Sequence, residues 1–275
     1  MTPTPATTPH PIQRDDVTVR STDPDTVIGR AFRLLDAFRP GPAELTLNQL
    51  ASRCDLSRST AHRLAGQLAR QGALEQTDHG WRLGTRIFEL GQMVSPQRRL
   101  RELALPHMQD LFVATGQTVQ LAVEDDNEVL YIEIISGHRK APSPSRRGGR
   151  MPLHCTALGK VLLAFSGDGG RSYLAGDPVL TPRTPSTIIE LATLRRELHH
   201  VRHEQLAYDH EEAAAGLMCV AAPLLDGEGN AAAAMSVSMP TYGPLTLAAV
   251  APAVRTCARA LGRELARAAP IASRA

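Results

Sequence analysis

Residues 46–72, TLNQLASRCDLSRSTAHRLAGQLARQG, decide the fold of the first part of the chain. The apolar residues of this stretch recur at helical spacing in two groups, on either side of a short connection over Arg53–Leu56. The first group is Leu47, Leu50 and Ala51, and the second is Leu56, Ala61, Leu64 and Leu68. Ser57 lies where the N-cap of the second helix belongs, because its hydroxyl can accept from the open amides of the next turn. The pattern therefore predicts a helix-turn-helix.

The outward side of the second helix carries cations and hydrogen-bond donors. No carboxylate occurs from Ser57 to Arg70, which suits a surface that enters a phosphate-lined groove of double-stranded DNA. The residues expected to contact DNA are Ser57, Arg58, Ser59, Thr60, His62 and Arg63. The alternative is a small helical domain whose arginines are only solvated, because basic amphipathic helices are common.

The flanking sequence favours the DNA-binding alternative. The segment Val27–Phe38 has the apolar spacing of one buried helical face. After Gly72, Ala73–Glu75 and Trp81–Leu83 read as two short strands joined through the glycine-containing turn Thr77–Gly80. Three helices followed by a two-stranded wing predict a winged helix-turn-helix domain over residues 26–84.

Composition limits the classes of protein that remain. The 275 residues are enough for two domains, and the net charge of +2 means that a nucleic-acid surface is local. The four cysteines are far apart and form no C-x-x-C pair, so neither a disulfide framework nor a zinc finger is expected. The chain has no apolar run of membrane-spanning length and no recognisable leader. We expect a soluble, cytoplasmic protein with no membrane partner.

The remaining organisation is predicted from periodicity and composition. Residues 1–25 are rich in Thr and Pro and read as a disordered tail. Residues 85–96 read as a linker helix whose apolar stripe, with Phe88 in it, lacks a partner in so small a domain. This stripe favours contact with a second subunit, as expected of a dimeric DNA reader. Residues 97–270 form the second domain, with helices at both ends and hairpins between them.

Two features of the second domain point to a ligand. In Met151–Lys160 a helix begins near Thr156, so four amides without intrahelical acceptors lie at the positive end of the helix dipole. Such an end is an anion site, although Gly159-Lys160 lacks the other residues of a P-loop. Ser236 and Ser238 lie two apart on a strand of small residues and therefore face the same side.

These segments carry a family resemblance. The motifs are LHCTALGK at 153–160, Glu211-Glu212, GLMCVAAP at 216–223 and Ser236-Val237-Ser238. With them the chain resembles the IclR family of bacterial transcriptional regulators from about Val27 to Ala268. The resemblance implies an α+β protein: a winged helix-turn-helix, a linker helix and a C-terminal effector-binding domain related to the GAF and PAS folds.

The resemblance also implies a function and a set of site residues. Family members are ligand-responsive regulators, usually repressors, that bind operator DNA as dimers or dimers of dimers. Their C-terminal domains bind small metabolites, often carboxylates, without a cofactor. The matching effector-binding positions in this chain are Thr156, Ala157, Leu158, Asp209, Leu217, Cys219, Ser236 and Ser238. Because Asp209 would repel a carboxylate, we expect it opposite the amides, at the other end of the ligand.

Three alternatives stay open at this point. Cys155 beside His154, with Asp209 and His210 elsewhere, contains the residue types of a Cys-His hydrolase. The second alternative is a zinc site, which resemblance to some family members permits. Its ligands would be Cys155, Cys219 and Asp209 with His154 or His210. In the third, the pocket residues are only structural: Cys219 is a small buried apolar residue, and the serines satisfy neighbouring backbone.

Overall fold

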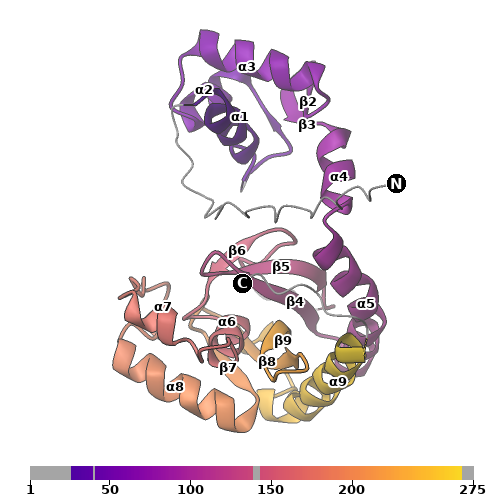
Figure 1. Ribbon diagram of the computed structural model, residues 1–275, viewed down its shortest axis with the longest axis vertical. Helices are drawn as coiled ribbons and strands as arrows, with labels where there is room; N and C mark the ends of the chain where they lie inside the picture. Colours follow the sequence, from indigo (N-terminus) through magenta and orange to yellow (C-terminus); the bar gives the residue numbers. More distant parts are fainter. Residues whose placement is uncertain (1–25, 40, 139–142, 268–275) are drawn as a thin grey trace, which may run out of the picture. The chain divides into compact units, whose positions relative to one another are not determined.

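The computed structural model describes residues 26–39, 41–138 and 143–267. They form two compact units that divide between Met93 and Val94, and each unit is described by itself (Figure 1). The tail predicted for residues 1–25 lies outside the described residues. Within the described ranges, no helix is long and apolar enough to cross a membrane.

The first unit contains the three predicted helices, α1 (Val27–Asp36), α2 (Leu47–Arg53) and α3 (Arg58–Arg70). Their apolar faces meet in one core. Its buried members are Leu34, Ala37, Leu45, Leu50, Cys54, Leu64, Ala65, Leu74 and Trp81. The spacing seen in the sequence therefore corresponds to one buried face on each helix, which confirms the predicted helix-turn-helix.

The wing has one more strand than predicted. The hairpin of β2 (Leu74–Thr77) and β3 (Gly80–Leu83) is present, and β1 (Glu44–Leu45) pairs with the other side of β3. A two-residue strand is too short to show alternation, which explains why it was missed. Gly80 has φ 152°, and a β-carbon there would lie 2.3 Å from the Leu45 carbonyl oxygen. Glycine therefore permits the close approach of β1 to the turn.

The predicted linker helix is α4 (Thr85–Gln92). It begins where the Glu75 carboxylate accepts from the Thr85 amide, with a nitrogen–oxygen distance of 3.3 Å. None of its residues is buried, and Phe88 is 69% exposed. The apolar stripe expected from the sequence therefore has no partner among the described residues.

The second unit is built on a six-stranded sheet in the order β6-β5-β4-β9-β8-β7, in which every neighbouring pair is antiparallel. The strands are β4 (Thr118–Asp125), β5 (Glu128–Ile135), β6 (Arg150–Pro152), β7 (Ala207–His210), β8 (Leu217–Leu225) and β9 (Ala231–Pro240). The two predicted hairpins, β4-β5 and β8-β9, meet where β4 pairs with β9. The short edge strands β6 and β7 were not predicted, because three or four residues carry little periodicity.

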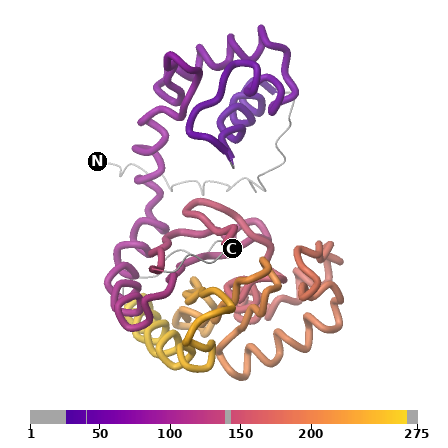
Figure 2. Tube along the Cα trace, turned by 180° about the vertical axis from the view of Figure 1, so that it is seen from behind, coloured from indigo at the N-terminus to yellow at the C-terminus, as the bar shows by residue number. Residues whose placement is uncertain are grey.

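Helices cover both faces of this sheet. On one face, α5 (Ser95–Thr115) and α9 (Leu247–Arg267) lie side by side in both views (Figures 1 and 2). On the other face, α6 (Ala157–Ala164) packs on the sheet, and α7 (Arg171–Ala175) and α8 (Leu191–Glu204) join the same core. Two separate apolar cores result, one on each side of the sheet.

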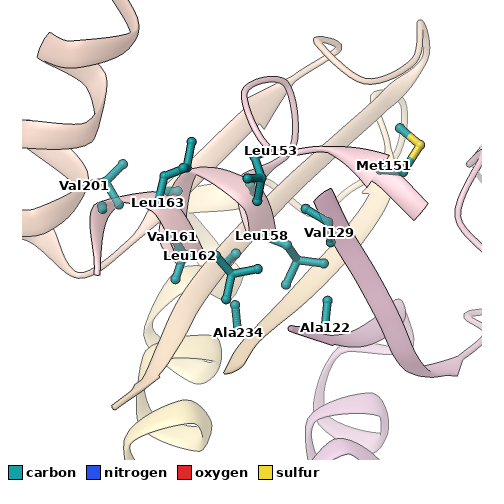
Figure 3. Packing of buried hydrophobic residues seen from close by; sticks show 14 of the residues in the cluster. Ala122, Val129, Met151, Leu153, Leu158, Val161, Leu162, Leu163, Val201 and Ala234 are labelled. Carbon is teal, nitrogen blue, oxygen red and sulfur yellow. The ribbon is translucent and has the colours of Figure 1, made fainter. Parts of the chain in front are cut away.

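α6 is the central element of its layer. All eight of its residues are buried. Leu158 and Leu162 point toward Ala122 and Ala234 of the sheet, whereas Leu163 faces α8 (Figure 3). The amino end of α6 is therefore held inside the protein, beside the sheet.

Candidate functional site

The first candidate site is the outward face of α3. Ser57 is its N-cap, as predicted: the Ser57 Oγ accepts from the Thr60 amide at 3.2 Å and also contacts the Thr60 hydroxyl at 2.9 Å. Ala61, Leu64 and Ala65 on the inner face are buried. The cap and this inner face together fix which residues of α3 face outward.

Those outward residues are the ones predicted to contact DNA. Arg58, Ser59, His62 and Arg63 are exposed, Ser57 is exposed at the cap, and Thr60 is half-buried. Within the described part of the chain, the Arg58 and Arg63 guanidinium groups make no ion pair or hydrogen bond. Two unpaired guanidinium groups on one helical face are available to phosphates and to the acceptors of base edges.

The second candidate site is a cavity at the amino end of α6, which we call the α6 cavity. Seven of the eight residues predicted to bind an effector line it: Thr156, Ala157, Leu158, Asp209, Leu217, Cys219 and Ser236. Ser238 does not line it. This serine is buried on β9 opposite Cys219, beside the thiol, and its hydroxyl has no conventional hydrogen-bond partner in the described structure.

The cavity is small in this structure. The space open to the centre of a water-sized sphere is about 10 Å³, which is roughly what one water molecule needs. A metabolite of several heavy atoms therefore requires the walls to move.

The backbone at the start of α6 is held in place by two short-range contacts. Thr156 Oγ1 donates to the Pro152 carbonyl oxygen at 3.3 Å and accepts from the Gly159 amide at 3.0 Å. A β-carbon at residue 159 would lie 2.2 Å from the Leu153 carbonyl oxygen, so only glycine allows this turn to press on the helix. The amides of Ala157 and Leu158 precede the capped amide and have no intrahelical acceptor.

Polar residues that the sequence analysis missed complete the lining. Gln120 Oε1 accepts from the Ser236 hydroxyl at 3.0 Å, and its Nε2 donates to Ser145 Oγ at 2.6 Å. Ser145 Oγ is in turn 2.6 Å from Ser143 Oγ. Gln120 pairs with Ser236 across β4 and β9, a long-range register that the sequence alone does not show. The serines lie on a segment without regular structure, so periodicity gave no signal for them.

Asp209 is 1% exposed, and its Oδ1 accepts from the Glu212 amide at 2.7 Å. Burial raises the pKa of this carboxyl to about 6, against the lowering effect of the Glu212 amide; the Glu212 charge raises it further. Asp209 lines the α6 cavity together with Thr156, and its carboxylate already accepts hydrogen bonds from amides of its own turn.

Among the residues that the structure describes, Lys160 is the largest fully buried side chain, and the sequence analysis gave it no structural role. Its Nζ donates to Glu212 Oε1 at 2.6 Å and to Glu197 Oε1 at 3.3 Å. Glu212 Oε2 is buried and has no partner in the described structure. One ammonium group thus ties α6 to α8 and to the turn that positions Asp209.

The chemistry of the remaining candidates does not favour catalysis. Burial and the Asp209 charge raise the pKa of Cys155 to about 12, so the thiol is protonated at neutral pH. The adjacent His154 directs Nε2 to the Thr181 carbonyl oxygen at 3.2 Å, and burial lowers its pKa. A protonated thiol beside an imidazole held elsewhere is not an activated nucleophile.

Zinc binding gains no support either. His210 is exposed and stacks on Tyr208, with 5.9 Å between ring centroids. Among the described residues, no group of three or more His, Cys, Asp or Glu side chains is arranged to hold a metal ion.

Comparison with known proteins decides whether the chain is an enzyme. The family model "Bacterial transcriptional regulator IclR C-terminal" matches residues 92–263, and "IclR helix-turn-helix domain" matches residues 27–78. The chain belongs to the IclR family of bacterial transcriptional regulators. As an IclR-family member it is a DNA-binding transcription regulator and not an enzyme. The hydrolase alternative is therefore wrong.

Individual IclR-family relatives cover most of the chain. The HTH-type transcriptional regulator XynR of Escherichia coli (strain K12) is 35% identical over 213 residues, which are 77% of this chain and 84% of XynR. The DNA-binding transcriptional repressor YiaJ of the same strain is 31% identical over 217 residues, 77% of each chain. A solved IclR homolog from Microbacterium hydrocarbonoxydans, complexed with 4-hydroxybenzoate, has a TM-score of 0.79 and 29% identity, and the match covers 89% of this chain and 100% of that one.

Proposed function

We propose that this regulator binds operator DNA through α3 and that a carboxylate metabolite in the α6 cavity alters that binding. The observation that carries the proposal is the α6 cavity itself: free helix amides at Ala157 and Leu158 share one enclosure with Asp209, Cys219 and Ser236. A helix amino end favours an anion. The 4-hydroxybenzoate in the Microbacterium homolog is a carboxylate, which supports the same ligand class here.

In the DNA complex, Arg58 and Arg63 are proposed to contact base edges or phosphates in the major groove. Ser57, Ser59, Thr60 and His62 are proposed as further donors along the same face. Ser57 also caps α3 and bonds Thr60, so its hydroxyl already has hydrogen-bond partners within the helix. Since YiaJ is named a repressor, repression is the sign of regulation that we propose.

In the effector complex, the carboxylate is proposed to bind the Ala157 and Leu158 amides, with Asp209 and Ser236 at the other end of the ligand. Leu217 and Cys219 then form walls, and Ser238 supports Cys219 from behind. The segment Ser143–Ser145 lines the cavity without belonging to a helix or strand. We infer that this segment moves when the cavity widens, because it belongs to no helix or strand and has no such hydrogen-bond ladder to break.

We also propose that α4 is covered by a second copy of the chain. In α4, Phe88 is 69% and Leu90 53% exposed, and its C-cap Met93 is 72% exposed, which together make a large apolar surface for one short helix and its cap. Two α3 helices in one dimer would read two half-sites of an operator. Whether dimers pair further into tetramers depends on surfaces outside this stripe.

The effector proposal is tested with the full chain by calorimetric titration. The ligands are 4-hydroxybenzoate, benzoate and acetate, each paired with its neutral amide. We expect at least one acid to bind saturably while its amide does not, because the helix amides select a negative charge. A Ser236→Ala variant should bind the same acid more weakly. Failure of all three acids, or equal binding of acid and amide, would overturn the anion assignment.

A further inference from the structure

A second hollow lies on the second unit, at the far end of β8 from the α6 cavity. The pairing of β7 with β8 ends at Ala207 opposite Ala221, so β8 continues from Ala222 to Leu225 without that neighbour. α9 passes beside this bare stretch and leaves a groove of about 250 Å³, measured as space open to the centre of a water-sized sphere. It is lined by Gln205, Ala222, Pro223, Leu225, Asp226, Arg255, Arg259, Gly262, Arg263 and Ala266. It shares no residue with the α6 cavity.

Three arginines on one face of α9 dominate the lining, and we call this hollow the arginine groove. Arg255, Arg259 and Arg263 are four residues apart, so they follow one another along the same side of the helix. A β-carbon added at Gly262 would lie 3.2 Å from the Leu225 amide nitrogen, so α9 passes close to β8 at this point. The three arginines of α9 therefore line a groove whose opposite side is formed by β8.

Few of the N–H groups of these three arginines bind an acceptor among the described residues. Arg259 Nη2 donates to Gln205 Oε1 at 2.7 Å. Arg255 Nε is buried and has no hydrogen-bond partner in the described structure. Arg263 makes no ion pair or hydrogen bond with any other described residue.

The carboxylates near the groove already accept hydrogen bonds from other groups. Asp226 is the acid that lines it, and its Oδ1 accepts from the amides of Glu228 and Asn230, both at 2.9 Å. Glu204 is near enough for Arg255 to contribute to lowering its pKa, but its carboxylate is bound by His203 at 2.9 Å. With three arginines and one carboxylate in its lining, the groove carries an excess of positive charge.

We propose that the arginine groove is a second ligand site, for a small anion that carries two or more phosphate or carboxylate groups. Like charges four residues apart on a helix repel one another, so an anion between them relieves a cost that the free protein bears. Guanidinium forks match phosphate and carboxylate oxygens. The volume of the groove is near the lower end of the range for small-molecule pockets, so it fits a small metabolite.

The test is calorimetric titration of the full chain at constant ionic strength, with inorganic pyrophosphate, citrate and acetate as separate ligands. We expect saturable binding of pyrophosphate or citrate with one site per chain that the groove arginines support, and no acetate binding that depends on those arginines. The tighter of the two identifies phosphate or carboxylate as the preferred group. Arg259→Gln with Arg263→Gln should weaken binding about tenfold or more, because two charge-assisted hydrogen bonds are lost.

Two controls make the result specific. Arg195→Gln with Arg196→Gln removes the same charge from exposed positions on α8 and should leave binding unchanged. Ser236→Ala should also leave it unchanged; loss of citrate binding in that variant would place citrate in the α6 cavity and overturn the carboxylate arm. Absence of saturable binding for both polyvalent anions, or equal weakening in both arginine pairs, would overturn the proposal. If the groove double variant does not fold, Arg263→Gln alone serves, since that side chain is exposed.

Discussion

α3 and α6 begin in the same way and end up in opposite environments. Each has a hydroxyl N-cap that accepts from the third amide, Ser57 for α3 and Thr156 for α6. Yet Arg58 and Arg63 are exposed and unpaired within the described residues, whereas Lys160 of α6 is buried and bound to Glu212.

The comparison shows that a cap is a local property, while the use of a helix end depends on what surrounds it. An exposed amino end with free cations suits a long polyanion such as DNA, where contacts with phosphates position the protein and contacts with bases select sequence. A buried amino end, whose one cation is already neutralised, offers only its amides. This arrangement suits a small anion that enters a closed cavity.

The largest expected effect comes from removing the buried cation. Lys160→Met leaves the Glu212 carboxylate buried without its partner, so the free energy of unfolding should fall by about 3–5 kcal/mol. Arg63→Met on α3 should change it by no more than about 0.5 kcal/mol. Urea unfolding followed by circular dichroism measures both changes. Tryptophan fluorescence would not, because the single tryptophan, Trp81, lies in the first unit and does not report on α6.

A second substitution separates charge from packing in that experiment. In Lys160→Met with Glu212→Gln the orphaned charge is gone, so part of the lost stability should return. If Lys160→Met is as stable as Arg63→Met, the contrast between the two helices is wrong.

Asp209 makes the buried site sensitive to pH. Its pKa is raised from 3.8 to about 6 in the folded protein, so between these values the unfolded chain loses the proton first. Stability therefore falls as pH rises from about 4 to about 6 through this residue. Asp209→Asn keeps an acceptor for the Glu212 amide and removes the ionisation, which should stabilise the protein by up to about 3 kcal/mol at pH 7.5.

The same Asp209→Asn variant should match the wild type at about pH 3, where Asp209 is protonated in both the folded and the unfolded chain. Thermal unfolding of the two proteins across this pH range gives the difference directly. A difference that does not change with pH would show that Asp209 is already ionised at low pH in the folded state.

On the exposed helix the expected effect is on binding and not on folding. Arg58→Ala and Arg63→Ala should each weaken operator binding by about 1–3 kcal/mol if the arginine contacts a base edge. Arg195→Ala, an exposed arginine of α8, is the matched control and should bind as the wild type does. Unchanged affinity in both α3 variants would remove α3 as the reader.

The smallest effect is expected at the cavity wall. Ser236→Ala removes a hydroxyl that bonds Gln120 and faces the α6 cavity, so effector affinity should fall by about 1 kcal/mol. Operator affinity without effector should stay the same. Fluorescence anisotropy on operator DNA, with and without effector, measures both affinities. Ser186→Ala, at an exposed position, is the control. Loss of DNA binding in Ser236→Ala would make it a structural position.

How much the sequence could predict follows from the range of each interaction. The caps at Ser57 and Thr156 depend on residues three apart, and both were found. Seven residues that line the α6 cavity were predicted through the family resemblance, because they come from four separate segments, whereas Gln120, Ser143 and Ser145 were missed. Lys160 and Glu212 are 52 residues apart, and nothing local selects that pairing. The edge strands were missed because two to four residues give no period to read.

The most direct test of the account is fluorescence anisotropy of the full chain on DNA from upstream of its own gene, against scrambled DNA of equal length. At physiological salt the account predicts a preference of roughly 10³ or more for the upstream DNA. It also predicts that a carboxylate identified by calorimetry changes the upstream affinity in the wild type, with a weaker response in Ser236→Ala. Equal, salt-sensitive binding to both DNAs, with no response to the carboxylate, would contradict it.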